Sequence, residues 1–124
     1  MKVIDSSLWI EFFIGTEFGK SVVQLLDNEE DILVPTIVIT EVYKKFLNSS
    51  THEISTAIFK KLTTFQTASF DLKLSALAAT LGKQYKLPIA DSIIYSTTIH
   101  HEATLYTLDK HFQGLSNVKY FEKN

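Results

Sequence analysis

Short β-type runs alternate with helical segments along the whole chain, and this alternation constrains the fold more than any other feature of the sequence. The β-type runs are expected at residues 2–5, 31–34, 67–70 and 103–108, with a possible fifth at 117–121. The helical segments are expected at residues 6–15, 17–28, 35–48, 50–65, 72–86 and 87–101. Short strands that alternate with helices indicate a mainly parallel sheet covered on both faces. The sequence therefore predicts an α/β fold, a three-layer α/β/α sandwich of Rossmann-like class with four to five strands.

Polar residues mark where three of these helices are expected to begin. Ser6 or Ser7 is expected to cap the first helix, and Asp71 is expected to cap the helix that starts at residue 72. Ser50 and Glu53 have the spacing of a capping box, in which each side chain binds a backbone N–H at the start of a helix.

The composition is that of one ordinary globular domain, expected to span residues 1–124. Hydrophobic residues make up 45% of the chain and charged residues 21%, which allows a single core. There is no cysteine, so disulfides and thiolate metal sites are excluded. No apolar run reaches the roughly 18 residues that a membrane span needs, and acids interrupt the apolar stretch near residue 1, unlike in a signal peptide. We therefore expect a cytoplasmic protein with no membrane contact.

The charge balance argues against a dedicated nucleic-acid-binding surface. The formal net charge is −2, and all 12 basic residues are lysine, whereas dedicated nucleic-acid binders usually carry a basic excess. Any contact with nucleic acid must therefore be local. The absence of arginine also excludes bidentate guanidinium recognition of guanine by this chain.

Four acids differ from the rest because they approach the expected core side of the sheet. Asp5 and Asp109 follow predicted strands, and Glu41 and Asp91 border the apolar stripes of two predicted helices. Ligands of parallel sheets bind beyond the carboxyl ends of the strands. Clustered carboxylates resist ionising together unless a cation compensates them, and oxygen ligands select hard ions such as Mg²⁺ or Mn²⁺. Such an ion polarises phosphoryl oxygens and acidifies bound water, which suggests phosphodiester hydrolysis.

Each of these acids also has a purely structural interpretation. Asp5 and Asp109 are candidates for helix caps, and Glu41 for an ordinary surface acid. Asp91 lies in the first turn of its predicted helix, where the helix dipole favours a negative charge. Spacing alone does not decide between the two interpretations.

The chain resembles the PIN domain, in particular the small single-domain ribonucleases that act as toxins in VapBC-type toxin–antitoxin pairs. Segments 3–10, 40–46, 87–99 and 105–112 carry the resemblance, in the order and at the spacing of that family. The family's four acidic positions fall, in order, on Asp5, Glu41, Asp91 and Asp109. Its small hydroxyl residues after the first acid and before the fourth fall on Ser6 and Thr107.

The resemblance implies a divalent-metal-dependent endoribonuclease that uses Mg²⁺ or Mn²⁺. Asp5 and Asp91 would be the principal ligands of the ion, and Glu41 and Asp109 would bind it directly or through water. Ser6 and Thr107 would orient the carboxylates. The implied partners are an RNA substrate, a cognate antitoxin protein and a second copy of the chain in a homodimer.

One position departs from the family's pattern. Many relatives carry a further acid two residues after the fourth one, and this chain has His111 there. A neutral imidazole binds metal and would shift the preference towards Mn²⁺; the alternative is a surface histidine near a loop. A non-catalytic PIN-like module that binds RNA or a protein is therefore the alternative function. A phosphatase-like enzyme is disfavoured, because the second Asp that such enzymes often carry would fall on Ser7.

Overall fold

Within residues 1–123, five parallel strands form the centre of the fold. The computed structural model describes residues 1–123, and Asn124, the last residue of the predicted domain, lies outside the described residues. The strands are β1 (Lys2–Ile4), β2 (Leu33–Pro35), β3 (Gln66–Ala68), β4 (Thr104–Thr107) and β5 (Val118–Tyr120). β1, β4 and β5 form a three-stranded sheet, and β2 and β3 form a two-stranded sheet. A parallel bridge between Lys2 and Ile32 joins the two sheets. The spatial order is therefore β3–β2–β1–β4–β5, which confirms the predicted parallel sheet.

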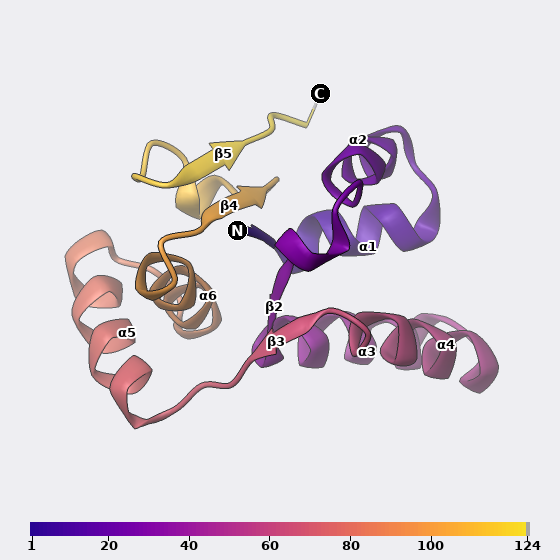
Figure 1. The fold of residues 1–124 in the computed structure, drawn as a ribbon, viewed down its shortest axis with the longest axis horizontal. Coiled ribbons are helices and arrows are strands. Elements are labelled where there is room, and N and C mark those ends of the chain that lie inside the picture. The colour runs from indigo at the N-terminus through magenta and orange to yellow at the C-terminus, as the bar shows by residue number, and fades with distance from the viewer. Residues whose placement is uncertain (124) are drawn as a thin grey trace.

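Helices cover the strands from two sides. They are α1 (Ser6–Ile14), α2 (Glu17–Leu25), α3 (Thr36–Ser49), α4 (His52–Leu62), α5 (Leu72–Tyr85) and α6 (Ile89–His100), with short 3₁₀ turns η1 (Glu29–Asp31) and η2 (Lys110–Phe112). Figure 1 shows α5 and α6 on one side of the strands, with α1 to α4 on the other. The predicted three-layer arrangement is confirmed. Within residues 1–123, none of the helices combines the length and the apolar character that crossing a bilayer demands.

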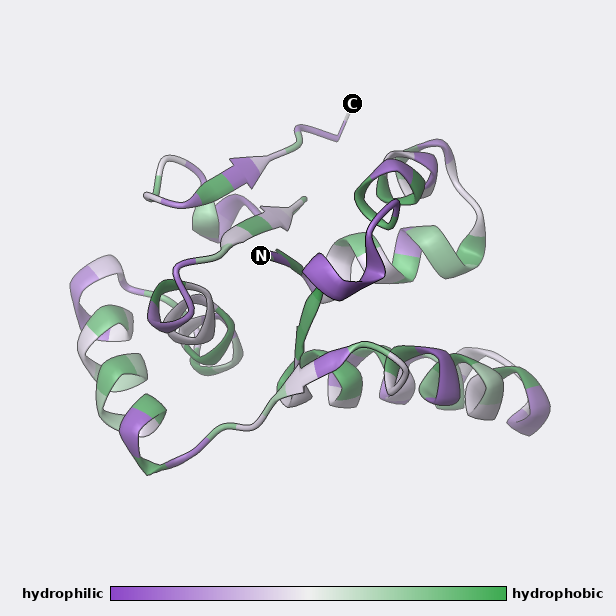
Figure 2. Cartoon of the chain, in the orientation of Figure 1, coloured by the Kyte–Doolittle hydropathy of each residue, from purple (hydrophilic) through white to green (hydrophobic). Residues whose placement is uncertain are grey.

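The central strands are apolar because both of their faces are covered. Val3, Ile4, Val34 and Leu105 are completely buried, as expected for parallel strands between two helical layers. Figure 2 shows this as a hydrophobic stretch through β2, between helices whose ribbons alternate hydrophobic and hydrophilic residues. The core therefore holds the strand ends in fixed positions.

The beginning of α1 differs from the prediction in a way that matters for function. Asp5, rather than Ser6 or Ser7, occupies the cap position, and its side chain makes no capping hydrogen bond. Its backbone N–H instead donates to the carbonyl of Tyr106, which continues the β1–β4 ladder for one residue. The Asp5 carboxylate is therefore free to point towards the sheet edge.

The predicted capping box at α4 is wrong by one residue. Thr51 caps this helix, and its Oγ1 accepts a hydrogen bond from the N–H of Ile54 at 3.1 Å. Ser50 instead closes α3, with an extended backbone. At α5 the predicted cap is confirmed, because Oδ1 of Asp71 accepts from the N–H of Leu74 at 2.9 Å.

A close helix contact positions the start of α6. A Cβ at Gly82 of α5 would lie 2.4 Å from Oγ of Ser92 on α6, so any larger residue there would force the Ser92 hydroxyl to move. The Ser92 hydroxyl donates to the carbonyl of Pro88 at 3.0 Å. The first turn of α6, which carries Asp91, is therefore held tightly against α5.

Candidate functional site

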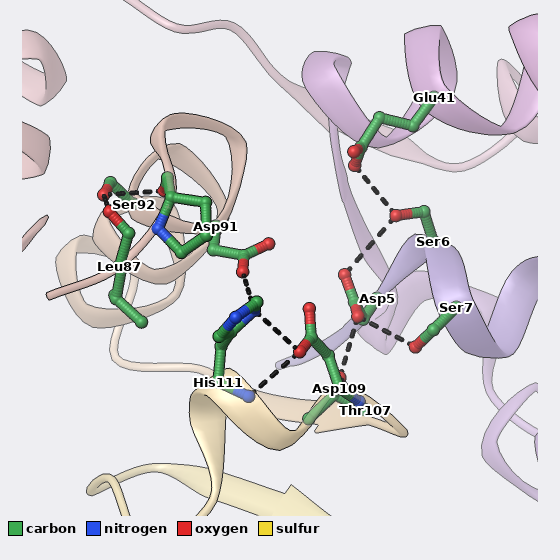
Figure 3. A network of polar contacts seen from close by, with 11 residues as sticks. Asp5, Ser6, Ser7, Glu41, Leu87, Asp91, Ser92, Thr107, Asp109 and His111 are labelled. Atoms are coloured by element: carbon green, nitrogen blue, oxygen red, sulfur yellow. Dashed lines mark hydrogen bonds and ion pairs between the residues drawn. The ribbon is translucent and has the colours of Figure 1, made fainter. Parts of the chain in front are cut away.

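The four acids singled out in the sequence gather at the carboxyl edge of the sheet. Asp5 directly follows β1, and Asp109 lies two residues beyond β4. Glu41 projects from the second turn of α3 and Asp91 from the first turn of α6. Figure 3 shows the carboxylates of Asp5, Asp91 and Asp109 directed towards a common region, with Glu41 extending from α3 towards Ser6. The parallel topology therefore brings the four positions together from distant parts of the chain.

Asp5 is buried and held by hydroxyl groups. Asp5 is only 3% exposed. Its Oδ2 accepts hydrogen bonds from Oγ1 of Thr107 at 2.7 Å and from Oγ of Ser7 at 2.8 Å. Within residues 1–123 no basic side chain lies within 4.0 Å of this carboxylate, as an ion pair would require. Burial raises the pKa of Asp5 above its ordinary value, although the hydroxyl donors oppose this. The carboxylate is thus oriented but not neutralised.

The hydroxyls of Thr107 and Ser7 also fix the loop that carries Asp109. Thr107 donates to Asp5 and accepts from the N–H of Asp109 at 2.9 Å. Ser7 likewise accepts from the N–H of Leu108 at 3.1 Å. Asp5 and the loop after β4 are therefore held by the same two side chains.

Ser6 connects the first acid to the acid on α3. Its Oγ donates to Oε1 of Glu41 at 2.8 Å and lies 3.5 Å from Oδ1 of Asp5. A hydroxyl has one proton to donate, and the shorter contact shows that Glu41 receives it. Burial raises the pKa of Glu41, with smaller contributions from the charges of Asp5 and Asp109.

The second pair of acids is bridged by an imidazole. Nδ1 of His111 lies 2.9 Å from Oδ2 of Asp91 and 3.0 Å from Oδ1 of Asp109. One ligand atom from each of these three side chains lies within 4.8 Å of the other two. This close group does not include Asp5 or Glu41. The structure thus arranges the four acids as two pairs, one joined through Ser6 and the other through His111.

The charges of the two pairs act on one another. Burial, followed by repulsion from Asp109 and Asp5, raises the pKa of Asp91 from 3.8 to about 7. The neighbouring charges of Asp109 and then Asp91 raise the pKa of His111. Burial is the main cause of the raised carboxyl pKa values at this edge of the sheet, and repulsion among the acids adds to it.

A divalent cation fits this set of donors. The four carboxylates lie at one edge of the sheet, and ligand atoms of Asp91, Asp109 and His111 lie within 4.8 Å of one another. Among residues 1–123, His111 is the one basic side chain within ion-pair distance of any of the four acids. Carboxylate oxygens suit Mg²⁺ and Mn²⁺, and an imidazole suits transition ions. A bound cation would attract the carboxylates and so offset the repulsion that adds to their raised pKa values.

Sequence reasoning missed the role of Ser7 at this site. It placed Ser7 only as a possible helix cap, whereas the structure shows its hydroxyl on Asp5. A hydroxyl residue two positions after a strand-ending acid is a signal that could have indicated this contact. The prediction for His111 left two interpretations open, and the structure places its ring between two of the acids.

Comparison with known proteins identifies the family. The PIN domain family model matches residues 2–117, and the chain belongs to that family. No curated protein sequence matches the chain.

Solved structures share the fold over nearly the whole chain. A toxin–antitoxin complex from Klebsiella pneumoniae matches with a TM-score of 0.84 at 22% identity, covering 96% of both chains. The VapBC2 complex from Rickettsia felis, bound to a promoter DNA fragment, matches with a TM-score of 0.74 at 18% identity, covering 98% of both chains. Mycobacterium tuberculosis VapC20, described as a sarcin–ricin loop-cleaving toxin, matches with a TM-score of 0.77 at 14% identity, covering 94% of this chain and 95% of the other. At these identities the likeness establishes the fold.

Proposed function

We propose that this protein is a divalent-metal-dependent endoribonuclease and the toxin of a toxin–antitoxin pair. The observation that supports it most is the convergence of four carboxylates at the sheet edge, with the pKa of Asp91 raised to about 7. Membership of the PIN family and the likeness to toxin structures support the same function. Acids that repel one another in this way are costly to the fold unless they hold a cation.

In this proposal Asp5 and Asp91 are the principal ligands of Mg²⁺ or Mn²⁺, and Glu41 and Asp109 bind it directly or through water. An ion held by these residues would polarise a phosphate oxygen and make a nearby water more acidic. Thr107 holds one oxygen of Asp5 through its hydroxyl, which leaves the other oxygen turned towards the site. Ligand orientation by such hydrogen bonds is what sets metal affinity in protein sites.

The proposed partners are an RNA substrate, a cognate antitoxin and a second copy of the chain, in the cytoplasm. Exposed apolar side chains on the α3–α4 surface support association with protein: Leu47, Ile54 and Phe59 are all at least 38% exposed. Tyr43 packs against Phe59 there, with ring centroids 4.9 Å apart.

Cleavage of a structured RNA, with Mn²⁺ or with EDTA, tests the proposal. We expect Asp5→Asn and Asp91→Asn to abolish metal-dependent cleavage. Asp27→Asn, which neutralises an exposed acid outside the site, is the matched control and should leave cleavage unchanged. Equal cleavage by all four proteins, or cleavage that survives EDTA, would contradict the proposal.

A non-catalytic module that binds RNA or protein is the second candidate. The position of His111 favours it, because a protonated imidazole between Asp91 and Asp109 supplies an internal positive charge where an ion is proposed. This candidate predicts RNA binding without cleavage at any concentration of Mg²⁺ or Mn²⁺.

A further inference from the structure

His111 is placed at the candidate site by its backbone as well as by its ring. Its N–H donates to Oδ1 of Asp109 at 2.9 Å, which closes the η2 turn. The next residue, Phe112, is completely buried and packs against the ring of Tyr95. The turn is therefore anchored on both sides of His111, and its imidazole is held towards the acids although the side chain is 56% exposed.

The ring presents the same nitrogen to both acids. Nδ1 lies 2.9 Å from Asp91 and 3.0 Å from Asp109, as Figure 3 shows. A neutral imidazole carries a lone pair on one ring nitrogen. In the metal-free protein, Nδ1 at these distances donates its proton to the two carboxylates. A bound cation would replace that proton, and it would face the nitrogen lone pair and two carboxylate oxygens, atoms that lie within 4.8 Å of one another.

We propose that His111 is a direct ligand of the divalent ion through Nδ1, and that this site prefers Mn²⁺ to Mg²⁺ for that reason. The inference rests on the proposed function for the presence of an ion, and adds which residue binds it and which ion it selects. Imidazole nitrogen is a better ligand for transition ions than for Mg²⁺, which takes oxygen. The α3 side of the site, with Asp5 and Glu41, supplies oxygen alone.

Pulsed electron paramagnetic resonance of bound Mn²⁺ tests the inference without an activity assay. A directly bound imidazole couples its ¹⁴N nucleus to the electron spin of the ion, and carboxylates do not. The wild-type protein loaded with Mn²⁺ should show this coupling. His111→Asp, which supplies a carboxylate instead, should still bind Mn²⁺ and lose the coupling. His52→Asn removes an exposed histidine at the start of α4 and is the matched control that should keep it.

Competition between the two ions gives a second measurement. We expect His111→Asp to lower the ratio of Mn²⁺ affinity to Mg²⁺ affinity severalfold, because the variant replaces the nitrogen ligand with an oxygen ligand that suits both ions. An unchanged ratio, or Mn²⁺ bound to the wild-type protein without ¹⁴N coupling, would overturn the assignment of His111 and leave the proposed nuclease standing. Failure of the wild-type protein and of His111→Asp to bind Mn²⁺ at all would overturn the proposed function together with this inference.

Discussion

Replacing Asp91 with asparagine should stabilise the metal-free protein while weakening its response to metal. Asparagine has nearly the shape of aspartate and carries no charge, so it removes the repulsion from Asp109 and Asp5. The pKa of Asp91 is raised to about 7, first by burial and then by that repulsion. The ionised carboxylate is therefore held at a cost to folding.

The magnitude follows from the displaced pKa. A change from 3.8 to about 7 corresponds to about 4 kcal/mol, at about 1.36 kcal/mol for each pKa unit. The side chain is 13% exposed, and water and salt screen the repulsion, so we expect Asp91→Asn to raise the free energy of unfolding by roughly 1–2 kcal/mol at pH 8.

The effect should depend on pH with a defined sign. Because the pKa of Asp91 is higher in the folded chain than in the unfolded chain, the folded chain holds an extra proton between about pH 4 and about pH 7. Wild-type stability should decline across that interval as the pH rises. The asparagine variant lacks this titration, so its advantage should be small near pH 4 and complete above about pH 7.

Urea unfolding at several pH values, in EDTA and in Mn²⁺, measures both effects. At Mn²⁺ concentrations a hundredfold above Kd, a folded-state site adds about 2.7 kcal/mol, and we expect the wild type to gain this and the variant to gain far less. Asp27→Asn, at an exposed acid, should behave like the wild type in both media. A variant that is less stable than the wild type in EDTA at pH 8 would show that the attraction of His111 outweighs the burial and repulsion of the Asp91 carboxylate, and would refute the reasoning.

Three further substitutions probe the supports of the site and the fold. Thr107→Val should cost about 1–3 kcal/mol in urea unfolding, because it removes a hydrogen bond to the buried Asp5 carboxylate and leaves a backbone N–H without its acceptor; it should also weaken Mn²⁺ binding measured by calorimetry. Lys123 lowers the pKa of Glu11, so Glu11→Gln should lose roughly 0.5 kcal/mol at pH 7, and the difference from the wild type should vanish as unfolding is followed below about pH 4. Gly19→Ala should destabilise the protein by about 2–3 kcal/mol in urea, because its Cβ would lie 2.3 Å from the carbonyl oxygen of Glu11; a gain in stability, as helix propensity alone would give, would contradict this packing.

The sequence was sufficient to predict that the acids gather at one edge of the sheet, because their positions depend on the topology of the fold. Alternating strands and helices imply a parallel sheet, and in such a sheet Asp5 and Asp109 must lie at the same edge. The contact of Ser7 with Asp5 was missed, because Ser7 was considered only as a cap of α1, a position that Asp5 takes instead. The cap of α4 was missed for a similar reason, because Thr51 and not the adjacent Ser50 caps that helix. Choices between adjacent residues are made by side-chain packing, which periodicity does not encode.

The hydroxyl groups around Asp5 explain how the protein keeps its charge available. A buried carboxylate needs hydrogen-bond donors, and a lysine or arginine in that place would supply them while cancelling the charge. Ser7 and Thr107 donate without carrying charge, and their oxygens also accept N–H groups from the loop after β4. These hydrogen bonds fix the orientation of the carboxylate without cancelling its charge. After burial and the charge of Asp109, the uncancelled charge of Asp5 also raises the pKa of Asp91, and a divalent cation bound at this edge of the sheet would relieve that repulsion.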